Sequence, residues 1–480
     1  MSDEKPNILW ICTDQQRYDT IASLGNELIN TPNIDRLVNG GVAFTRAYVQ
    51  SPVCSPSRAS FLTGRYPRTT RCRQNGQDIP PTERLVTRIL ADHGYTCGLS
   101  GKLHLGSCEN GRVEPRIDDG YDAFYWSHHP QPDWKENAYT QWLEFKGQVW
   151  EKLYAGPGDG YVKEGVPTEY HQTTWCANMA IDFIKEQNEA GPWCYTFNCF
   201  DPHHPFDPPP EYMKRYNPDD MPLPKYRKGE LDDKPIFQRR DHKSAHNESG
   251  EFPFDKMTDE NKQSITAAYY AMIELIDDSV GRMLAALEKT GQLDNTIVIF
   301  MSDHGEMLGD HGFYLKGPHF YEQAVRVPLI FSWPGHFKED LKADALVELV
   351  DIAPTLLEAA GIDPPEGMQG KSLSGMLTGK ERPDNHRDSI LCEYYNSWQH
   401  KDAYGTMLRT KDKKICVYHS PGNPEIEEPG ELYDLSMDPE EFTNLWNNPG
   451  YAEVKCEMMR KAFDRSVLTM DPLPVRLGEF

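Results

Sequence analysis

Residues 296–305 read TIVIFMSDHG, an apolar run rich in β-branched and aromatic residues that ends in a polar cluster beginning at Ser302. An uninterrupted apolar run of this length is typical of a strand that is buried on both faces, as in a parallel sheet. Asp303 and His304 would then lie at the carboxyl end of that strand, where ligands bind in open α/β sheets. The stretch therefore predicts both the fold class and the edge of the sheet at which a site should form.

The same pattern of a strand followed by polar residues recurs along the chain. The runs are NILWIC (7–12), GVAFTRAYV (41–49), YTCGLS (95–100) and WCYTFNCF (193–200). Amphipathic helical patterns stand between them, at 81–94, where Gly94 is the expected end, and at 264–291. Strands that alternate with helices predict an α/β fold with a large, mostly parallel sheet flanked by helices.

The chain of 480 residues is longer than one compact core usually holds. Residues 205–257 are rich in Pro, Asp and Lys and predict a long surface excursion. From about residue 380, short runs such as DSILCEYY (388–395) and KKICVYH (413–419) predict antiparallel strands, followed by a helical pattern. We expect an α/β domain that carries the site over 1–380, and a smaller C-terminal α+β subdomain with an antiparallel sheet over 381–480.

Charge and composition argue against some classes of function. Lys and Arg total 50 and Asp and Glu total 74, so the formal net charge is −24. Such an acidic surface argues against nucleic acid or an anionic membrane as a partner, although one positive pocket can still bind a small anion. No stretch approaches the ~20 apolar residues of a membrane span, and the first apolar run is too short for a secretory signal. We expect a cytoplasmic protein; the alternative is an exported protein whose signal has been removed.

One of the eleven cysteines, Cys54, lies in the segment SPVCSPSRASFLTGR (51–65). The cysteines lack CxxC spacing, which predicts reduced core thiols rather than a disulfide framework or a zinc site. Pro56 suits the first turn of a helix, and we expect Ser55 to be its N-cap. Cys54 would then face the positive end of that helix, where a nucleophile or an anion is favoured. A half-buried structural cysteine fits the local pattern equally well.

Two acidic residues, Asp14 and Asp303, each follow a predicted strand. Two carboxylates that converge on one edge of a sheet are a natural site for a hard divalent cation. Taken singly, each is more often a residue that caps a turn. Lys102 and His104 follow another strand, and solvated loop residues are the alternative interpretation there.

The string CSPSR (54–58) followed by LTGR (62–65) resembles the signature of the type I sulfatases, a family of the alkaline phosphatase superfamily. In that family a maturation enzyme, either oxygen-dependent or radical-based, converts the motif cysteine to formylglycine. Further segments resemble other motifs of the family: PNILWICTDQ (6–15), GYTCGLSGKLHLG (94–106), DPHHPF (201–206), MSDHGEMLGDHGFYLKG (301–317), RVPLIFSWPG (326–335) and ELYDLSMDPEEFTNL (431–445). The resemblance spans roughly residues 6–445 in family order, and it implies the α/β fold of that superfamily.

The resemblance implies a metal site. Its residues are Asp14, Gln15, Asp303, His304 and the converted Cys54. The common family pattern has two adjacent acids first and Asp-Asn later, so Gln15 and His304 lower the negative charge of the site, and an imidazole can hold softer ions than calcium. The implied cofactor is one divalent cation, with Ca²⁺ as the first expectation and Mn²⁺ or Mg²⁺ as alternatives.

The resemblance also implies a mechanism. The hydrated aldehyde derived from Cys54 would be held on the metal and attack sulfur, and Arg58 would neutralise the cluster. Lys102 and Lys316 would stabilise the negative charge on the sulfuryl oxygens. The second hydroxyl of the hydrate would then expel sulfate by elimination, which an ordinary Cys or Ser nucleophile cannot do.

Two histidines have implied proton-transfer roles. His203, which fits the register of the Pro-His-x-Pro loop, would be the general acid for the leaving alcohol, and His104 the base that assists sulfate release. The sequence leaves five other histidines unassigned: His128, His129, His171, His204 and His319. Three residues are candidate substrate contacts: Asn75, His319 and Tyr321.

The function that follows is hydrolysis of a small sulfate monoester, whether of a carbohydrate, an aryl or an alkyl alcohol. The implied partner is a formylglycine-generating or anaerobic sulfatase-maturating enzyme, and self-association into a homo-oligomer stays open. An alternative is a phosphonate monoester or phosphodiester hydrolase of the same superfamily, because Gln15 and His304 resemble those relatives. Lys102 and His104 resemble the sulfatases instead. A more distant alternative is a non-catalytic binding protein that keeps a sulfatase fold.

Overall fold

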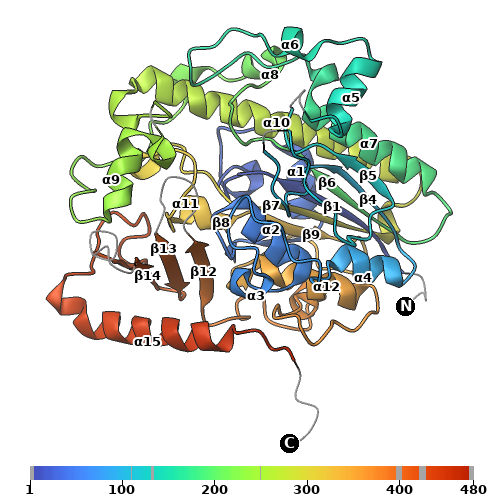
Figure 1. The fold of residues 1–480 in the computed structure, drawn as a ribbon. Helices are drawn as coiled ribbons and strands as arrows, with labels where there is room; N and C mark the ends of the chain where they lie inside the picture. Colours follow the sequence, from blue (N-terminus) through green and yellow to red (C-terminus); the bar gives the residue numbers. More distant parts are fainter. Residues whose placement is uncertain are drawn as a thin grey trace, which may run out of the picture.

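A computed structural model describes residues 5–109, 111–130, 134–248, 250–395, 403–420 and 429–474. An eight-stranded sheet runs through its centre in the order β10-β2-β9-β7-β1-β6-β4-β5 (Figure 1). Its strands are β1 (Asn7–Thr13), β2 (Val42–Phe44), β4 (Thr96–Gly101), β5 (Ala123–Trp126), β6 (Trp193–Asn198), β7 (Thr296–Ser302), β9 (Leu329–Ser332) and β10 (Leu341–Ala343). Among these eight strands only β9 pairs antiparallel with its neighbours, so the prediction of a large, mostly parallel sheet is confirmed.

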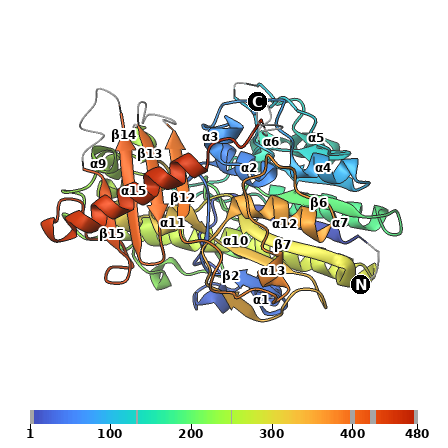
Figure 2. The ribbon, with the colours of Figure 1, turned by 90° about the horizontal axis from the view of Figure 1, so that it is seen from below.

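Helices cover both faces of this sheet (Figures 1 and 2). One face carries α1 (Pro32–Asn39), α7 (Gln172–Glu186) and α10 (Asp259–Lys289), and the other carries α2 (Cys54–Thr63), α4 (Val86–Asp92) and α12 (Ile352–Ala359). The strand β1 explains the two layers: Leu9 and Ile11 pack into one apolar core, whereas Trp10 packs into the other. Because side chains alternate along a strand, an apolar run with no polar position must be buried on both sides.

Four neighbouring strands, β7, β1, β6 and β4, run parallel. Their carboxyl ends therefore lie at the same edge of the sheet. Asp303 follows β7, Asp14 follows β1 and Asp201 follows β6. Lys102 follows the end of β4. The polar clusters that stand far apart in the sequence are thus brought together by strand order.

Three sequence predictions need correction at the level of single elements. The run 41–49 forms two strands, because β3 (Ala47–Tyr48) leaves the main sheet and pairs with β8 (Arg326–Val327) and β11 (Val347–Glu348). The long helix α10 begins at Asp259, where Thr258 and Asn261 form a capping box, and not at the predicted residue 264.

Ser55 is not the N-cap of α2, and that prediction is wrong. The helix begins at Cys54, after Val53 in extended conformation. The Ser55 backbone N–H donates to Asn75 Oδ1 at 2.9 Å, so a side chain from another segment satisfies one of the free amides of the first turn.

The C-terminal part forms an antiparallel sheet of β12 (Ile390–Tyr395), β13 (Tyr404–Arg409), β14 (Lys413–His419) and β15 (Glu431–Asp434), as predicted. Helix α15 (Ala452–Leu468) lies along this sheet (Figure 2). A domain boundary near residue 380 stays a prediction.

The shorter α-helices are α3 (Pro67–Thr70), α5 (Ala138–Phe145), α6 (Trp150–Leu153), α8 (Pro210–Met213), α9 (Ile236–Lys243), α11 (Glu322–Val325) and α13 (Ser374–Leu377). None of the helices in the described ranges has the length and apolar character needed to cross a membrane.

Candidate active site

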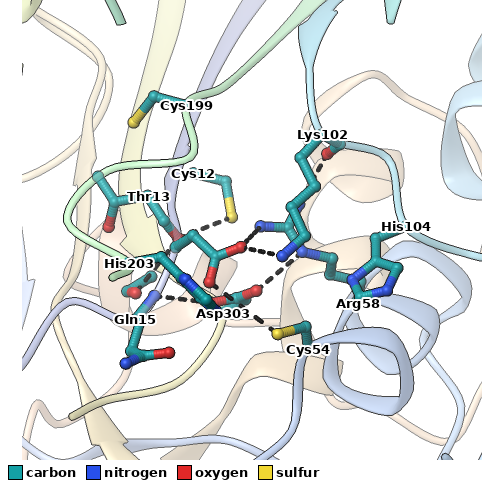
Figure 3. Close-up of polar contacts among 12 residues, drawn as sticks. Cys12, Thr13, Gln15, Cys54, Arg58, Lys102, His104, Cys199, His203 and Asp303 are labelled. Atoms are coloured by element: carbon teal, nitrogen blue, oxygen red, sulfur yellow. Dashed lines mark hydrogen bonds and ion pairs between the residues drawn. The ribbon is translucent and has the colours of Figure 1, made fainter. Parts of the chain in front are cut away.

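A pocket of about 380 Å³ opens at the carboxyl edge of the central sheet. It is lined by Cys54, Asn75, Lys102, His104, His128, His129, Phe200, His203, His204, Pro205, His246, Glu248, Glu251 and Lys316. Five of the six residues with predicted catalytic roles are in this lining, and the sixth, Arg58, lies beneath it and contacts Asp303 (Figure 3).

Cys54 is the first residue of α2 and is almost fully buried, although it lines the pocket. Its Sγ lies 3.0 Å from Nε2 of His304 and 4.0 Å from Oδ1 of Asp14. Burial alone would raise the pKa of the thiol, but the nearby Lys102 and Lys316 ammonium groups outweigh it and lower the pKa to about 7. A thiol with a lowered pKa beside cationic side chains has the kind of environment in which reactive cysteines are found.

Four ligand atoms, one each from Asp14, Cys54, Asp303 and His304, lie within 4.8 Å of one another, and these are four of the five residues predicted to bind a metal. His304 Nε2 lies 3.8 Å from Asp14 Oδ1 and 3.7 Å from Asp303 Oδ1. The other ring nitrogen, Nδ1, lies 2.9 Å from the carbonyl of Gly305 and donates to it. This contact fixes the tautomer and leaves the lone pair of Nε2 facing the two carboxylates.

Gln15 follows Asp14 with a left-handed backbone, at φ +68°. Its N–H donates to Asp303 Oδ1 at 3.1 Å, and its carbonyl accepts from the Tyr269 hydroxyl at 2.6 Å. Its side-chain amide donates to Glu306, and its Oε1 accepts from Lys316. Strained backbone of this kind persists where the surrounding structure holds it firmly, and functional sites are where it is usually found.

Arg58 joins the two carboxylates from below. Its Nε donates to Asp303 Oδ2 at 2.8 Å, and its Nη2 donates to Asp14 Oδ2 at 3.3 Å. A third bond runs from Nη1 to the carbonyl of Lys102 at 2.8 Å. Lys102 Nζ also donates to Asp14 Oδ2, at 2.5 Å. Burial would raise the pKa of Asp14, but Lys102 and Arg58 hold it well below its usual range.

Lys316 and His203 line the same pocket and contact each other. His203 Nδ1 donates to the carbonyl of His204 at 2.5 Å, so its Nε2 accepts from Lys316 Nζ at 2.6 Å. Burial and the Lys316 ammonium group lower the pKa of His203 well below its ordinary value. His203 is thus a neutral imidazole beside a cation in the protein without a bound substrate.

His104 has a left-handed backbone, at φ +59°, and is held by a buried carboxylate. Glu114 accepts from the backbone N–H of His104 at 2.8 Å and from that of Leu105 at 3.1 Å. Burial, followed by the Lys102 charge, lowers the pKa of His104 well below its ordinary value. The ring is therefore neutral and can accept a proton in the pocket.

The structure separates the histidines that the sequence left unassigned. His128, His129 and His204 line the pocket. His171 lies in the adjoining pocket of about 290 Å³, with Nδ1 3.6 Å from Asp201 Oδ2. His319 is buried elsewhere and contacts Asp241 Oδ2 at 2.6 Å.

Of the three predicted substrate contacts, only Asn75 lines the pocket. His319 is paired with Asp241, and the Tyr321 hydroxyl contacts Gln238 at 3.0 Å and Glu431 at 3.2 Å. Both side chains are almost fully buried and neither lines the pocket, so the prediction that they contact substrate is wrong.

Sequence reasoning missed several residues that shape the site. Glu306 orients the amide of Gln15, and Glu114 holds the loop that carries His104. The missed pocket-lining residues are Phe200, Pro205, His246, Glu248 and Glu251. Glu306 had a signal, because it follows Asp303 within one short polar cluster, and Pro205, His246, Glu248 and Glu251 lie in the predicted excursion 205–257.

A mostly parallel sheet that gathers acids, lysines and histidines at its carboxyl edge is the architecture of hydrolases of the alkaline phosphatase superfamily. The sulfatase family model matches residues 6–362, and the model for the C-terminal part of N-sulphoglucosamine sulphohydrolase matches residues 309–466. The chain belongs to the sulfatase family, as its motifs predicted.

Individual relatives agree over nearly the whole chain. An arylsulfatase of Clostridium perfringens is 32% identical over 474 residues, covering 95% of this chain and 93% of that protein. A choline-sulfatase of Rhizobium meliloti is 30% identical over 461 residues, covering 94% of this chain and 84% of that protein. The crystal structure of the phosphonate monoester hydrolase of Agrobacterium radiobacter has a TM-score of 0.85 and 26% identity, covering 99% of this chain and 98% of that one.

Proposed function

We propose that the chain hydrolyses sulfate monoesters, using a formylglycine made from Cys54 and one divalent cation. The observation that carries this proposal is the convergence of Cys54, Asp14, Asp303 and His304 in one pocket. Two ammonium groups, from Lys102 and Lys316, flank the same thiol. Such a pocket has both the positive charge that a sulfate group needs and a residue suited to nucleophilic chemistry.

The donor set fits a divalent cation. Carboxylate and amide oxygens from Asp14, Asp303 and Gln15 are the ligands that Ca²⁺, Mg²⁺ and Mn²⁺ prefer. The imidazole of His304, with its Nε2 lone pair facing Asp14 and Asp303, adds one nitrogen. We propose Ca²⁺ as the ion, with Mn²⁺ or Mg²⁺ as alternatives that the nitrogen donor keeps open.

The cation and the formylglycine supply two pieces of chemistry. A bound divalent cation supplies charge that lowers the pKa of a hydroxyl group and offsets the negative charge of the substrate. The hydrated formylglycine supplies that hydroxyl group, and its second hydroxyl gives a route to release sulfate. This conversion requires a maturation enzyme, which we propose as a partner of the chain.

The protein's own residues bind and orient the sulfate group. Arg58 neutralises Asp303 and part of the charge on Asp14, which keeps the floor of the pocket from repelling an anion. Lys102 and Lys316 line the pocket with Cys54 and lower the pKa of its thiol, which supports a role in contacting sulfuryl oxygens as negative charge develops on them.

We assign proton transfer to two histidines. Because His203 Nδ1 donates to the carbonyl of His204, proton transfer to a leaving alcohol would take place at Nε2, which faces Lys316. An anionic sulfate group beside Lys316 would favour protonation of that nitrogen. His104 is neutral in the pocket and would accept the proton when sulfate leaves.

A second function is favoured by a specific observation. The solved structure with a TM-score of 0.85 is that of a phosphonate monoester hydrolase, so hydrolysis of phosphonate monoesters or phosphodiesters is the alternative. Both reactions use a metal-centred nucleophile and cationic side chains, and the same pocket could serve both.

Matched esters distinguish the two functions. We expect a higher kcat/KM for 4-nitrophenyl sulfate than for 4-nitrophenyl phenylphosphonate, measured on protein coexpressed with a maturation enzyme. A large preference for the phosphonate would favour the alternative.

Mass spectrometry of the Cys54 peptide should show the aldehyde, and Cys54→Ala protein should be inactive. A screen of sulfated monosaccharides and disaccharides, aryl sulfates and choline sulfate would then define the leaving group.

A third outcome would point to a binding protein. Unmodified Cys54 after coexpression with either type of maturation enzyme, together with no turnover of any ester, would contradict both hydrolase proposals.

A further inference from the structure

A second group of metal-ligand side chains lies beside the proposed active site. His104, Cys108 and His128 each offer one ligand atom, and these three atoms lie within 4.8 Å of one another. The rings of His104 and His128 meet edge to face, with centroids 4.4 Å apart. The cluster forms because β4 and β5 are neighbours in the sheet, and the segments that follow them carry the three residues.

Two ring nitrogens of this cluster are buried without a partner. Nδ1 of His104 and Nε2 of His128 have no hydrogen-bond partner among the residues that the structure describes. His104 itself is only 7% exposed. Leaving a buried polar atom unpaired is costly and uncommon in folded proteins, and binding of an ion is one way in which such an atom is satisfied.

The position of His104 is fixed by the structure around it. Glu114 accepts from the backbone N–H groups of His104 and Leu105, at 2.8 and 3.1 Å. The same carboxylate accepts from Nε1 of Trp126, the last residue of β5, at 3.0 Å. The cluster thus has a firm frame and a buried carboxylate nearby that would offset part of a cation's charge.

We propose that His104, Cys108 and His128 form a regulatory site for a borderline-soft divalent cation, with Zn²⁺ as the expected ion. Two imidazoles and one thiolate are a ligand set that zinc takes with water as a fourth ligand, and they are poor ligands for Ca²⁺ or Mg²⁺. Cys108 is a half-buried free thiol outside the pocket lining. On binding, two Zn–N bonds and one Zn–S bond form and the thiol proton leaves to solvent, without any change of oxidation state.

The proposed site differs in chemistry from the oxygen-rich group at Asp14 and Asp303, so one protein can bind a hard and a softer cation at separate places. The regulatory effect rests on the proposed function. A histidine that ligates zinc cannot also accept a proton, and a zinc ion at His104 would add positive charge beside Cys54. Zinc would therefore inhibit sulfate ester hydrolysis.

Cobalt spectroscopy tests the site without reference to turnover. Protein with Cys54→Ser, in excess Ca²⁺, is titrated with Co²⁺, and we expect a thiolate-to-cobalt charge-transfer band that Zn²⁺ abolishes. Cys108→Ser should remove the band. Calorimetry should show that this substitution lowers the Zn²⁺ affinity by at least about 10- to 100-fold, because substitution of a residue that only orients a metal ligand already lowers metal affinity by that factor. His128→Ala should also weaken Zn²⁺ binding.

The matched control is Cys456→Ser, which removes an exposed thiol on α15 and should keep the band. No band with the Cys54→Ser protein, or the same band after Cys108→Ser, would overturn the proposal.

Inhibition tests the regulatory effect. In matured protein, Zn²⁺ should inhibit hydrolysis of 4-nitrophenyl sulfate. The Cys108→Ser protein should be active without zinc, and added zinc should not inhibit it. Equal inhibition of both proteins would overturn the regulatory effect. If no sulfate ester is hydrolysed but the cobalt band still depends on Cys108, the proposed function fails while the metal site stands.

Discussion

Arg58 and Asp303 form an ion pair at 2.8 Å between two side chains that are almost completely buried. The same guanidinium group reaches Asp14 and the carbonyl of Lys102. One residue of helix α2 therefore binds the ends of the strands β7, β1 and β4. Because the partners are also the predicted metal-binding acids, the folding of this edge and the chemistry of the site depend on the same contacts.

Arg58→Met should destabilise the protein strongly. The substitution leaves Asp303 and part of Asp14 as buried charges without their partner, which typically costs about 3–5 kcal/mol. Denaturant titration should show a lower unfolding midpoint, and any protein that folds should have lost its sulfatase activity. Arg84→Met is the control, because Arg84 is exposed and pairs with Asp92 at the surface, where an ion pair is worth about 1 kcal/mol or less. Equal midpoints for Arg58→Met and Arg84→Met would contradict the role given to Arg58.

Lys316→Met should reduce turnover more than it reduces stability. Loss of one donor to the developing charge costs about 10²- to 10³-fold in kcat in comparable sites. The measurement is kcat and KM on 4-nitrophenyl sulfate, with Lys225→Met as the control, because Lys225 is exposed and pairs with Glu440. An unchanged kcat in Lys316→Met would remove Lys316 from the mechanism.

Removal of the cation should lower both activity and stability. A ligand present at about 100 times its Kd stabilises the native state by about 2.7 kcal/mol, so extensive chelation should lower the unfolding midpoint correspondingly. Adding Ca²⁺, or else Mn²⁺ or Mg²⁺, should restore turnover and identify the ion. His304→Ala should weaken this rescue, whereas His336→Ala, at an exposed position that stacks on Trp333, should not. Full activity after chelation would contradict the metal proposal.

The central sheet and much of the site could be predicted because their signals are local. An apolar run such as 296–302, rich in β-branched residues, is typical of a strand buried on both faces, and the polar residues after such a strand lie at its carboxyl end. The order of the strands could not be read from the runs, because it depends on pairings between segments that lie far apart in the chain, such as Asn7 with Thr296 and Val42 with Leu341.

Of the two supporting carboxylates, only Glu306 had a signal in the sequence, its place after Asp303, and the role of neither could be predicted. Glu114 and Glu306 act by accepting N–H groups of loops that contain left-handed residues, and no periodicity marks such loops in a sequence. For His319 the sequence predicted a place in the site that the side chain does not have. It was a candidate substrate contact, but the side chain packs against Phe313 and pairs with Asp241. Distance along the sequence says little about the direction of a side chain in a loop.

Asp277 gives a prediction on stability and pH. It lies within α10, and its carboxylate accepts from the N–H groups of Asn33 and Ile34 at the start of α1, a helix without a side-chain cap of its own. Burial raises the pKa of Asp277 to about 6, well above the ordinary value of an aspartate.

Because the folded state holds this proton more tightly than the unfolded state, the contribution of Asp277 to stability is present below about pH 4 and is lost as pH rises through about 6. From about pH 5.5 to pH 8 the unfolding free energy of the wild type should therefore fall by about 1 kcal/mol relative to Asp277→Asn, which keeps an acceptor for Ile34 but does not titrate. Denaturant midpoints of both proteins at the two pH values provide the measurement. Asp294→Asn, at an exposed position before β7, should follow the wild type at both. A constant difference between wild type and Asp277→Asn would mean that Asp277 is ionised in the folded protein throughout this range.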